Sequence, residues 1–101
     1  MPGPYRGMAT IGVLTLELRL ENSHSLKEKR HVVESLKTRL RNKFNVAVAE
    51  IDHQDLWQRG TLAAVTVASD HVHAEKVLRS VEEEAASLLG PELAQTSVEW
   101  L

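Results

Sequence analysis

The chain has 101 residues, of which 43% are hydrophobic and 26% are charged, with a net charge of −2 and no cysteine. This size and balance are typical of one globular domain and argue against a disordered chain. The lack of cysteine excludes a disulfide scaffold, a zinc ribbon, an iron–sulfur cluster and a cysteine nucleophile. Because there is neither a long apolar run nor a signal-peptide core, we expect a soluble, cytoplasmic protein with no membrane partner.

The N-terminal third of the chain predicts a tail, a strand and a helix. Residues 1–7 contain two prolines and two glycines without periodicity, so we expect a flexible tail before a single domain over residues 8–101. Leucines from Leu14 to Leu20 alternate with polar residues, which predicts a strand over about 9–20. Ile11 and Val13 fall on the otherwise polar side of that strand, so we expect this side to be partly covered.

A capping box marks the first helix. Ser25 is followed three residues later by Glu28, so the helix should begin at Leu26 and run to about Asn42. Its apolar arc is formed by Leu26, Val32, Val33, Leu36 and Leu40.

The rest of the chain predicts two more strands, a second helix and a last strand. Strands are expected over about 44–51 and 59–68, separated by a polar turn, and Asp70 caps a helix over 71–89 that ends at Gly90-Pro91. Residues 96–101 read as a short final strand. The order β-α-β-β-α-β predicts a ferredoxin-like α+β sandwich. We expect a four-stranded antiparallel sheet in the order 4-1-3-2, with two helices on one face.

Positive charge is concentrated in the first helix. Seven of the twelve lysines and arginines lie between Lys27 and Lys43, whereas residues 70–84 carry a net negative charge. Four of these cations recur at helical spacing and form one stripe that could follow a phosphate backbone: Lys27, Arg30, Lys37 and Arg41. The alternative is an ordinary solvated helix face, which Glu34 supports because it can pair with Arg30 and Lys37.

A second group of polar residues should meet at one end of the sheet, where the loop at 21–25 approaches the turn at 52–58. The candidate ligand-site residues there are His24, Asp52, His53, Asp55, Trp57 and Arg59, with Ser25 beside them. Two imidazoles and two carboxylates could bind a divalent metal or supply an acid and a base. Capping of turn amides by the carboxylates explains the same residues without a ligand. His71 and His73 should lie at the opposite end, so the five histidines do not form one metal site.

Three stretches resemble signature segments of the YlxP-like family of small bacterial proteins, which carries a domain-of-unknown-function label. They are residues 23–30, 41–50 and 52–59, and the resemblance covers about residues 8–90. It implies a ferredoxin-like fold and no catalytic residue. Genes of this family often lie beside those for translation initiation and ribosome-maturation factors, which implies a role near RNA or the ribosome.

These observations predict a non-enzymatic accessory protein that contacts structured RNA or a ribosomal assembly intermediate through the basic helix. Because the third strand has no aromatic residue, RNA would be bound by the helix and loops and not by stacking on the sheet. The alternative is an interaction module that forms a homodimer through its open sheet face. A third interpretation is a metal-dependent nuclease built on His24, Asp52, His53 and Asp55. We expect no cofactor, no bound metal and no catalytic residue.

Overall fold

A computed structural model describes residues 9–101; the expected tail, residues 1–7, lies outside the described residues. The elements in chain order are β1 (Thr10–Arg19), α1 (Leu26–Lys43), β2 (Ala47–Asp52), β3 (Arg59–Ala68), α2 (His71–Leu89), a 3₁₀ turn (Gly90–Glu92) and β4 (Leu93–Trp100). This is the predicted β-α-β-β-α-β order.

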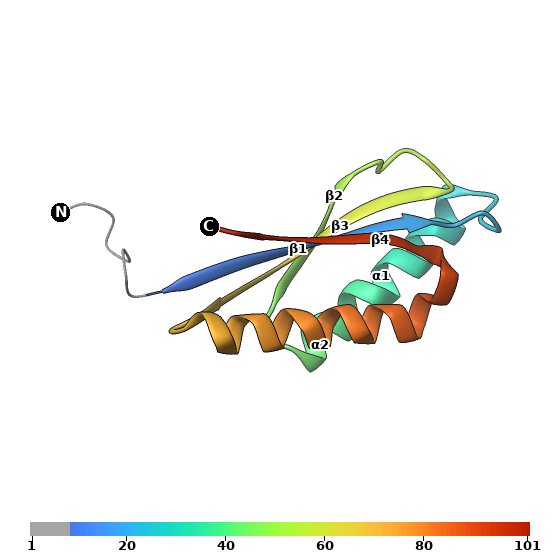
Figure 1. The fold of residues 1–101 in the computed structure, drawn as a ribbon. Coiled ribbons are helices and arrows are strands. Elements are labelled where there is room, and N and C mark those ends of the chain that lie inside the picture. Colours follow the sequence, from blue (N-terminus) through green and yellow to red (C-terminus); the bar gives the residue numbers. More distant parts are fainter. Residues whose placement is uncertain (1–8) are drawn as a thin grey trace.

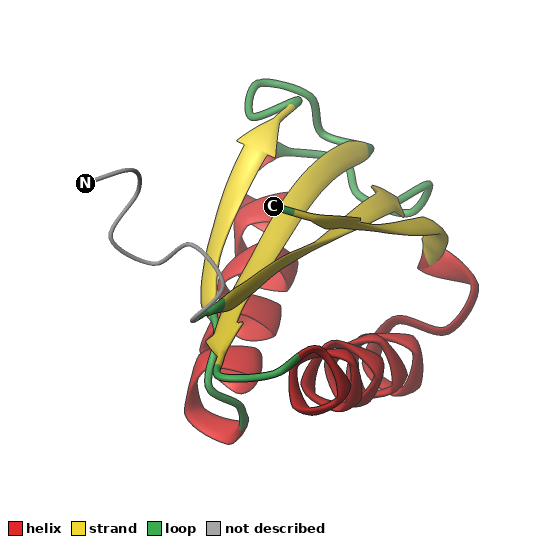
Figure 2. Cartoon of the chain, turned by 60° about the vertical axis from the view of Figure 1, so that its left-hand side comes forward, coloured by secondary structure: helices red, strands yellow, loops and turns green. Residues whose placement is uncertain are grey.

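The strands form one antiparallel sheet in the order β2-β3-β1-β4. Both helices lie on the same face of this sheet, and its other face has no element over it in the described part of the chain (Figures 1 and 2). The ferredoxin-like α+β fold and the strand order predicted from the sequence are therefore confirmed.

The core lies between the sheet and the two helices. The even-numbered leucines of β1, Leu14 to Leu18, and Leu20 directly after the strand are at most 1% exposed and pack against Leu36 of α1 and Leu78 of α2. Burial of each such side chain stabilises the fold by roughly 1.5–3 kcal/mol. Neither helix of residues 9–101 combines the length and apolar character needed to cross a bilayer.

Local hydrogen bonds set the helix starts. Ser25 Oγ accepts from Glu28 N at 3.1 Å, as the capping box predicts, but the Glu28 carboxylate accepts from His24 N at 2.5 Å and not from Ser25 N. At α2, Asp70 Oδ1 accepts from His73 N at 2.8 Å. The start of α1 at Leu26 and the bounds of α2 at 71–89 therefore match those expected. In the capping box of α1, the Glu28 carboxylate binds the amide one residue before the expected one.

Two strand boundaries differ from the prediction. β2 begins at Ala47 and not at residue 44, because Val46 N bonds Phe44 O and the Asn45 carbonyl accepts from the Thr66 hydroxyl at 2.8 Å, which keeps this segment out of the ladder. β4 begins earlier than expected, at Leu93. A shift in its register at Glu17/Leu18 accommodates the extra residue.

The open face of the sheet is apolar at its centre. Val13 and Val65 are cross-strand partners there, both half-buried, and Ile11 faces the exposed Val67 in the same pair of strands. The expected placement of Ile11 and Val13 away from the leucine side is confirmed.

Candidate nucleic-acid interface

The four cations predicted to form a stripe on α1 differ in whether they make an ion pair. Lys27, Arg30 and Arg41 are exposed and make no ion pair within residues 9–101. Lys37 is less exposed than a member of the stripe should be, at 20%, and its Nζ lies 3.2 Å from Glu34 Oε2, a pairing that the alternative of a solvated helix face anticipated. We use "basic stripe" below for Lys27, Arg30 and Arg41, which span about 21 Å at the helical rise per residue.

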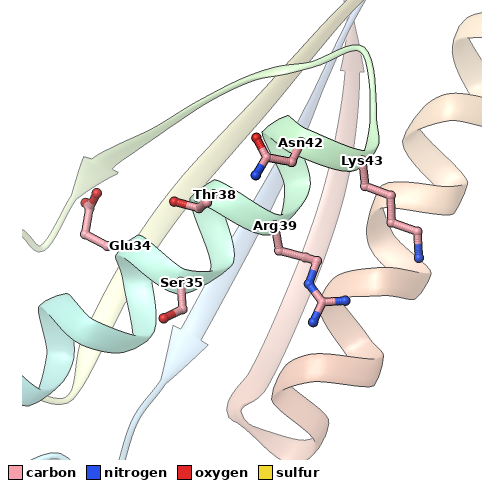
Figure 3. Close-up of a pocket in the computed structure, with 6 residues that line it drawn as sticks. All are labelled: Glu34, Ser35, Thr38, Arg39, Asn42 and Lys43. Atoms are coloured by element: carbon pink, nitrogen blue, oxygen red, sulfur yellow. The ribbon is translucent and has the colours of Figure 1, made fainter.

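The other flank of α1 faces α2 and carries neutralised charge. Arg39 Nη1 lies 3.2 Å and Lys43 Nζ 2.7 Å from the two carboxylate oxygens of Glu84. Figure 3 shows Arg39 and Lys43 reaching toward α2. Arg41 is two residues from Lys43, about 200° around the helix, so it lies on the opposite flank.

The Glu84 carboxylate is the electrostatic link between the helices. Its side chain is 14% exposed. The hydrogen bond from Lys43 lowers the pKa of Glu84 below its ordinary value of 4.5, burial opposes this, and the positive charges of Lys43 and Arg39 lower it further. Glu84 therefore stays ionised near neutral pH.

A shallow depression of about 620 Å³ lies on the surface of α1 (Figure 3). It is lined by Glu34, Ser35, Thr38, Arg39, Asn42 and Lys43. All six come from one helix, and none belongs to the basic stripe. Small-molecule sites are concave and enclosed, so this hollow does not define one.

Lys29 is the cation that the sequence reasoning missed. It is 1% exposed, its Nζ lies 2.6 Å from Glu50 Oε2, and it donates to the His53 carbonyl at 2.5 Å. The contact with Glu50 is an ion pair without good hydrogen-bond geometry. Lys29 continues the apolar arc between Leu26 and Val33, and this spacing was the available signal of its burial.

The two predicted loops do meet at one end of the sheet. Leu20 N donates to Gln58 O at 2.9 Å. The Gln58 side-chain amide donates to the carbonyls of Glu21 and Ser23 at 3.2 and 3.3 Å. These bonds hold the β2–β3 connection against the segment that leads into α1.

His53 lies in a hydrogen-bonded chain on this end of the sheet. The Thr61 hydroxyl donates to Glu17 Oε1 at 2.5 Å, and His53 Nδ1 lies 3.0 Å from Thr61 Oγ1. Since the single hydroxyl proton goes to Glu17, Nδ1 must carry the proton donated to Thr61. A neutral His53 then has an unprotonated Nε2. Its backbone is in the left-handed region, with φ of 63°.

The remaining candidate residues do not form one joint site with His53, although Asp55, Trp57 and Arg59 line one depression. Asp52 Oδ1 accepts from His53 N at 2.7 Å, as a turn cap would. His24, Asp55 and Arg59 are exposed, and Trp57 exposes 51% of its surface. Over residues 9–101, no group of three His, Asp or Glu side chains is placed to hold a metal ion.

The other histidine pair lies at the opposite end, as expected. The start of α2 lies at the far end of the sheet from the β2–β3 connection (Figure 1). His71 packs against Trp100 with ring centroids 4.2 Å apart and lies 3.5 Å from Glu75. These contacts give His71 a structural role.

Comparisons with known proteins agree with this fold. The chain is 40% identical over 90 residues to the uncharacterized protein YlxP of Bacillus subtilis (strain 168), covering 89% of this chain and 98% of that protein. A de novo designed protein, Foldit4, superposes with a TM-score of 0.57 over 92% of this chain and 96% of its own, at 11% identity, a likeness of fold alone. The family model described as "Protein of unknown function (DUF503)" matches residues 11–98. The resemblance to YlxP-like proteins is thereby confirmed, and the chain belongs to the DUF503 family.

Proposed function

We propose that this protein is a non-enzymatic, cytoplasmic accessory factor that binds structured RNA through the basic stripe. The observation that carries the proposal is the way carboxylates are distributed around α1. Glu50 and Glu84 neutralise the cations that face the rest of the fold, whereas Lys27, Arg30 and Arg41 are exposed and form no ion pair with the described part of the chain, residues 9–101. Unpaired cations on one straight element suit a phosphate backbone.

The salt dependence of binding tests the electrostatic part of the proposal. Three phosphate contacts predict a log–log slope of affinity against salt concentration between about −2 and −3. Fluorescence polarisation of a labelled RNA hairpin, titrated at several salt concentrations, measures this slope. A flat salt dependence would contradict the proposal.

Two variants that lose the same formal charge test where on the protein the RNA binds. Lys27→Gln/Arg30→Gln/Arg41→Gln removes the basic stripe and should weaken binding at least about tenfold. Arg39→Gln/Lys43→Gln/Lys76→Gln removes the same formal charge elsewhere and should leave affinity nearly unchanged. Equal losses in both variants would show that only net charge matters.

A second candidate function is homodimerisation through the open sheet face, favoured by its apolar centre. Val13, Val65 and Ile11 adjoin Val67, which is 55% exposed, and a contiguous apolar patch of this kind commonly marks a contact. A second copy related by a two-fold axis would cover it. Sedimentation at micromolar concentration should show a dimer that Val13→Lys dissociates, while Val72→Lys on α2, 64% exposed in the wild type, leaves it intact. A monomeric wild type would exclude this candidate.

A further inference from the structure

Trp57 is an exposed aromatic side chain on an ordered connection. It exposes 51% of its surface and shares a depression of about 490 Å³ with Arg59. The connection is held on both sides of the indole, by Leu56 N donating to the His53 carbonyl at 3.1 Å and by the bonds of Gln58 to the segment before α1. A pre-ordered indole offers a flat apolar surface at little entropic cost to a ligand.

Two arginines lie directly opposite one another on β1 and β3, and one of them, Arg59, lines the depression that contains Trp57. Arg19 of β1 and Arg59 of β3 are cross-strand partners, both exposed, and neither makes an ion pair within residues 9–101. Like charges in a directly opposed pair destabilise a sheet. An anion between the two guanidinium groups would remove this repulsion and satisfy their donors.

Trp57 and the two arginines line two depressions that share Arg59. Arg59 lines both the depression that contains Trp57 and a second one, of about 390 Å³, that contains Arg19 and Glu17. Glu17 also lines the second depression, and its Oε1 accepts the Thr61 hydroxyl without making an ion pair to either arginine within residues 9–101. The surface therefore combines a stacking platform with two cations.

We propose that Trp57, Arg59 and Arg19 bind an unpaired RNA nucleotide, with the base stacked on the indole and the adjoining phosphate between the guanidinium groups. The ligand class rests on the proposed RNA function, but the surface is a different one. Arg19 and Arg59 belong to the sheet, whereas the basic stripe lies on a helix.

The chemistry selects an unpaired nucleotide over a duplex. Both faces of a base inside a helix are covered by its neighbours, so only a splayed base can stack on an aromatic side chain. Planar guanidinium groups bind phosphate in a bidentate manner. Asp55 lines the same depression as Trp57, and its carboxylate can accept from a base amino group.

Tryptophan fluorescence provides a direct test. The chain has two tryptophans, and the other, Trp100, packs against His71 at the start of α2, with the two rings tilted by 50°. In Trp100→Phe, Trp57 is the sole tryptophan, and a short single-stranded oligoadenylate should quench its emission. The same strand annealed to its complement should quench it far less. In Trp57→Phe, the signal of Trp100 should not change with either probe.

Affinity variants separate stacking from charge. Trp57→Ala should weaken oligoadenylate binding about fivefold to a hundredfold, and Arg19→Gln or Arg59→Gln should each weaken it and flatten its salt dependence. Since all three side chains are exposed, the melting temperature should stay near that of the wild type. If Trp100→Phe fails to fold, fluorine NMR of wild type labelled with 5-fluorotryptophan should show that only the Trp57 resonance shifts.

The outcomes distinguish this proposal from that for the basic stripe. Duplex binding that requires Lys27, Arg30 and Arg41, without any response of Trp57 to single strands, would overturn the nucleotide site and leave the stripe. If single strands still quench Trp57 after the basic stripe is removed, the nucleotide site stands and the stripe is not needed for it. If adenosine monophosphate binds with the same affinity as the oligonucleotide, the site is a mononucleotide site and the RNA proposal is overturned.

Discussion

The ammonium group of Lys29 and the carboxylate of Glu50 lie 2.6 Å apart, with the Lys29 side chain 1% exposed. This ion pair joins the first turn of α1 to β2, and Lys29 also binds the carbonyl of His53, the residue held in a left-handed conformation. Gly60 lies beside this pair: a Cβ there would make an ordinary contact of 3.4 Å with Lys29 Cε. One buried cation thereby positions the connection that carries His53 and Trp57.

Lys29→Met should destabilise the protein by about 3 kcal/mol, because it leaves the Glu50 carboxylate and the His53 carbonyl without their partner in a largely buried site. Urea unfolding followed by circular dichroism measures the change. Lys37→Met, which removes only the surface pair with Glu34, is the matched control and should cost less than about 1 kcal/mol. Similar losses in the two variants would show that the buried pair has no special role.

Glu84 should make stability depend on pH in the acid range. Its folded-state pKa lies below its ordinary value of 4.5, so its contribution is complete above that value and is lost as pH falls through the lowered pKa. The difference in melting temperature between wild type and Glu84→Gln should therefore be present near neutral pH and shrink below about pH 4.5. Lys43→Gln, which removes the largest cause of the shift, should reduce the acid dependence. A difference that is constant across this range would refute the assignment.

Gly12→Ala should destabilise the sheet by about 1–3 kcal/mol through overpacking. A Cβ at Gly12 would lie 2.6 Å from Trp100 Cζ3 and 2.7 Å from Leu78 Cδ1, distances that require the core to move. Gly60→Ala is the control on the neighbouring strand, because its closest contact is an ordinary 3.4 Å. In thermal unfolding, the melting temperature of Gly12→Ala should lie clearly below that of Gly60→Ala. The opposite order would mean that Trp100 is not packed on Gly12.

The hydrogen-bonded chain from Glu17 to His53 predicts an uncommon tautomer. Neutral His53 should carry its proton on Nδ1, since Thr61 donates its own proton to Glu17. Nitrogen-15 NMR of the imidazole ring distinguishes the two tautomers. Thr61→Val removes the acceptor and should shift the population toward the Nε2-protonated form. If the Nε2-protonated form already dominates in the wild type, His53 Nδ1 accepts from the Thr61 hydroxyl, and the assigned hydrogen-bond direction is wrong.

Local chemistry made some elements predictable from the sequence. α2 runs over 71–89 as expected, because the Asp70 cap and the Gly90-Pro91 stop act through residues within one turn of the helix ends. The apolar side of β1 and the outward placement of Val13 follow from a period of two, which the sheet preserves.

Other features depended on contacts between distant segments. In the sequence, Lys29 looks like any other cation of α1. Its burial depends on Glu50 and His53, which are distant in sequence and lie beside it only in the folded sheet. The facing of Arg19 and Arg59 depends on the register of β1 against β3, which no short pattern specifies. The basic stripe was predicted as four residues, and the Glu34–Lys37 pair reduces it to three. Its RNA-binding role stays a prediction.

The position of β1 has a consequence for folding kinetics. β1 precedes every other described element, yet it pairs with both β3 and β4, so that Gly12 lies opposite Trp100. Contacts between residues so far apart in sequence raise the contact order, and a high contact order slows folding because long loops must close before pairing stabilises them. During synthesis β1 is therefore made well before β4, and until β4 pairs with it, that edge of β1 stays open to pairing with other chains.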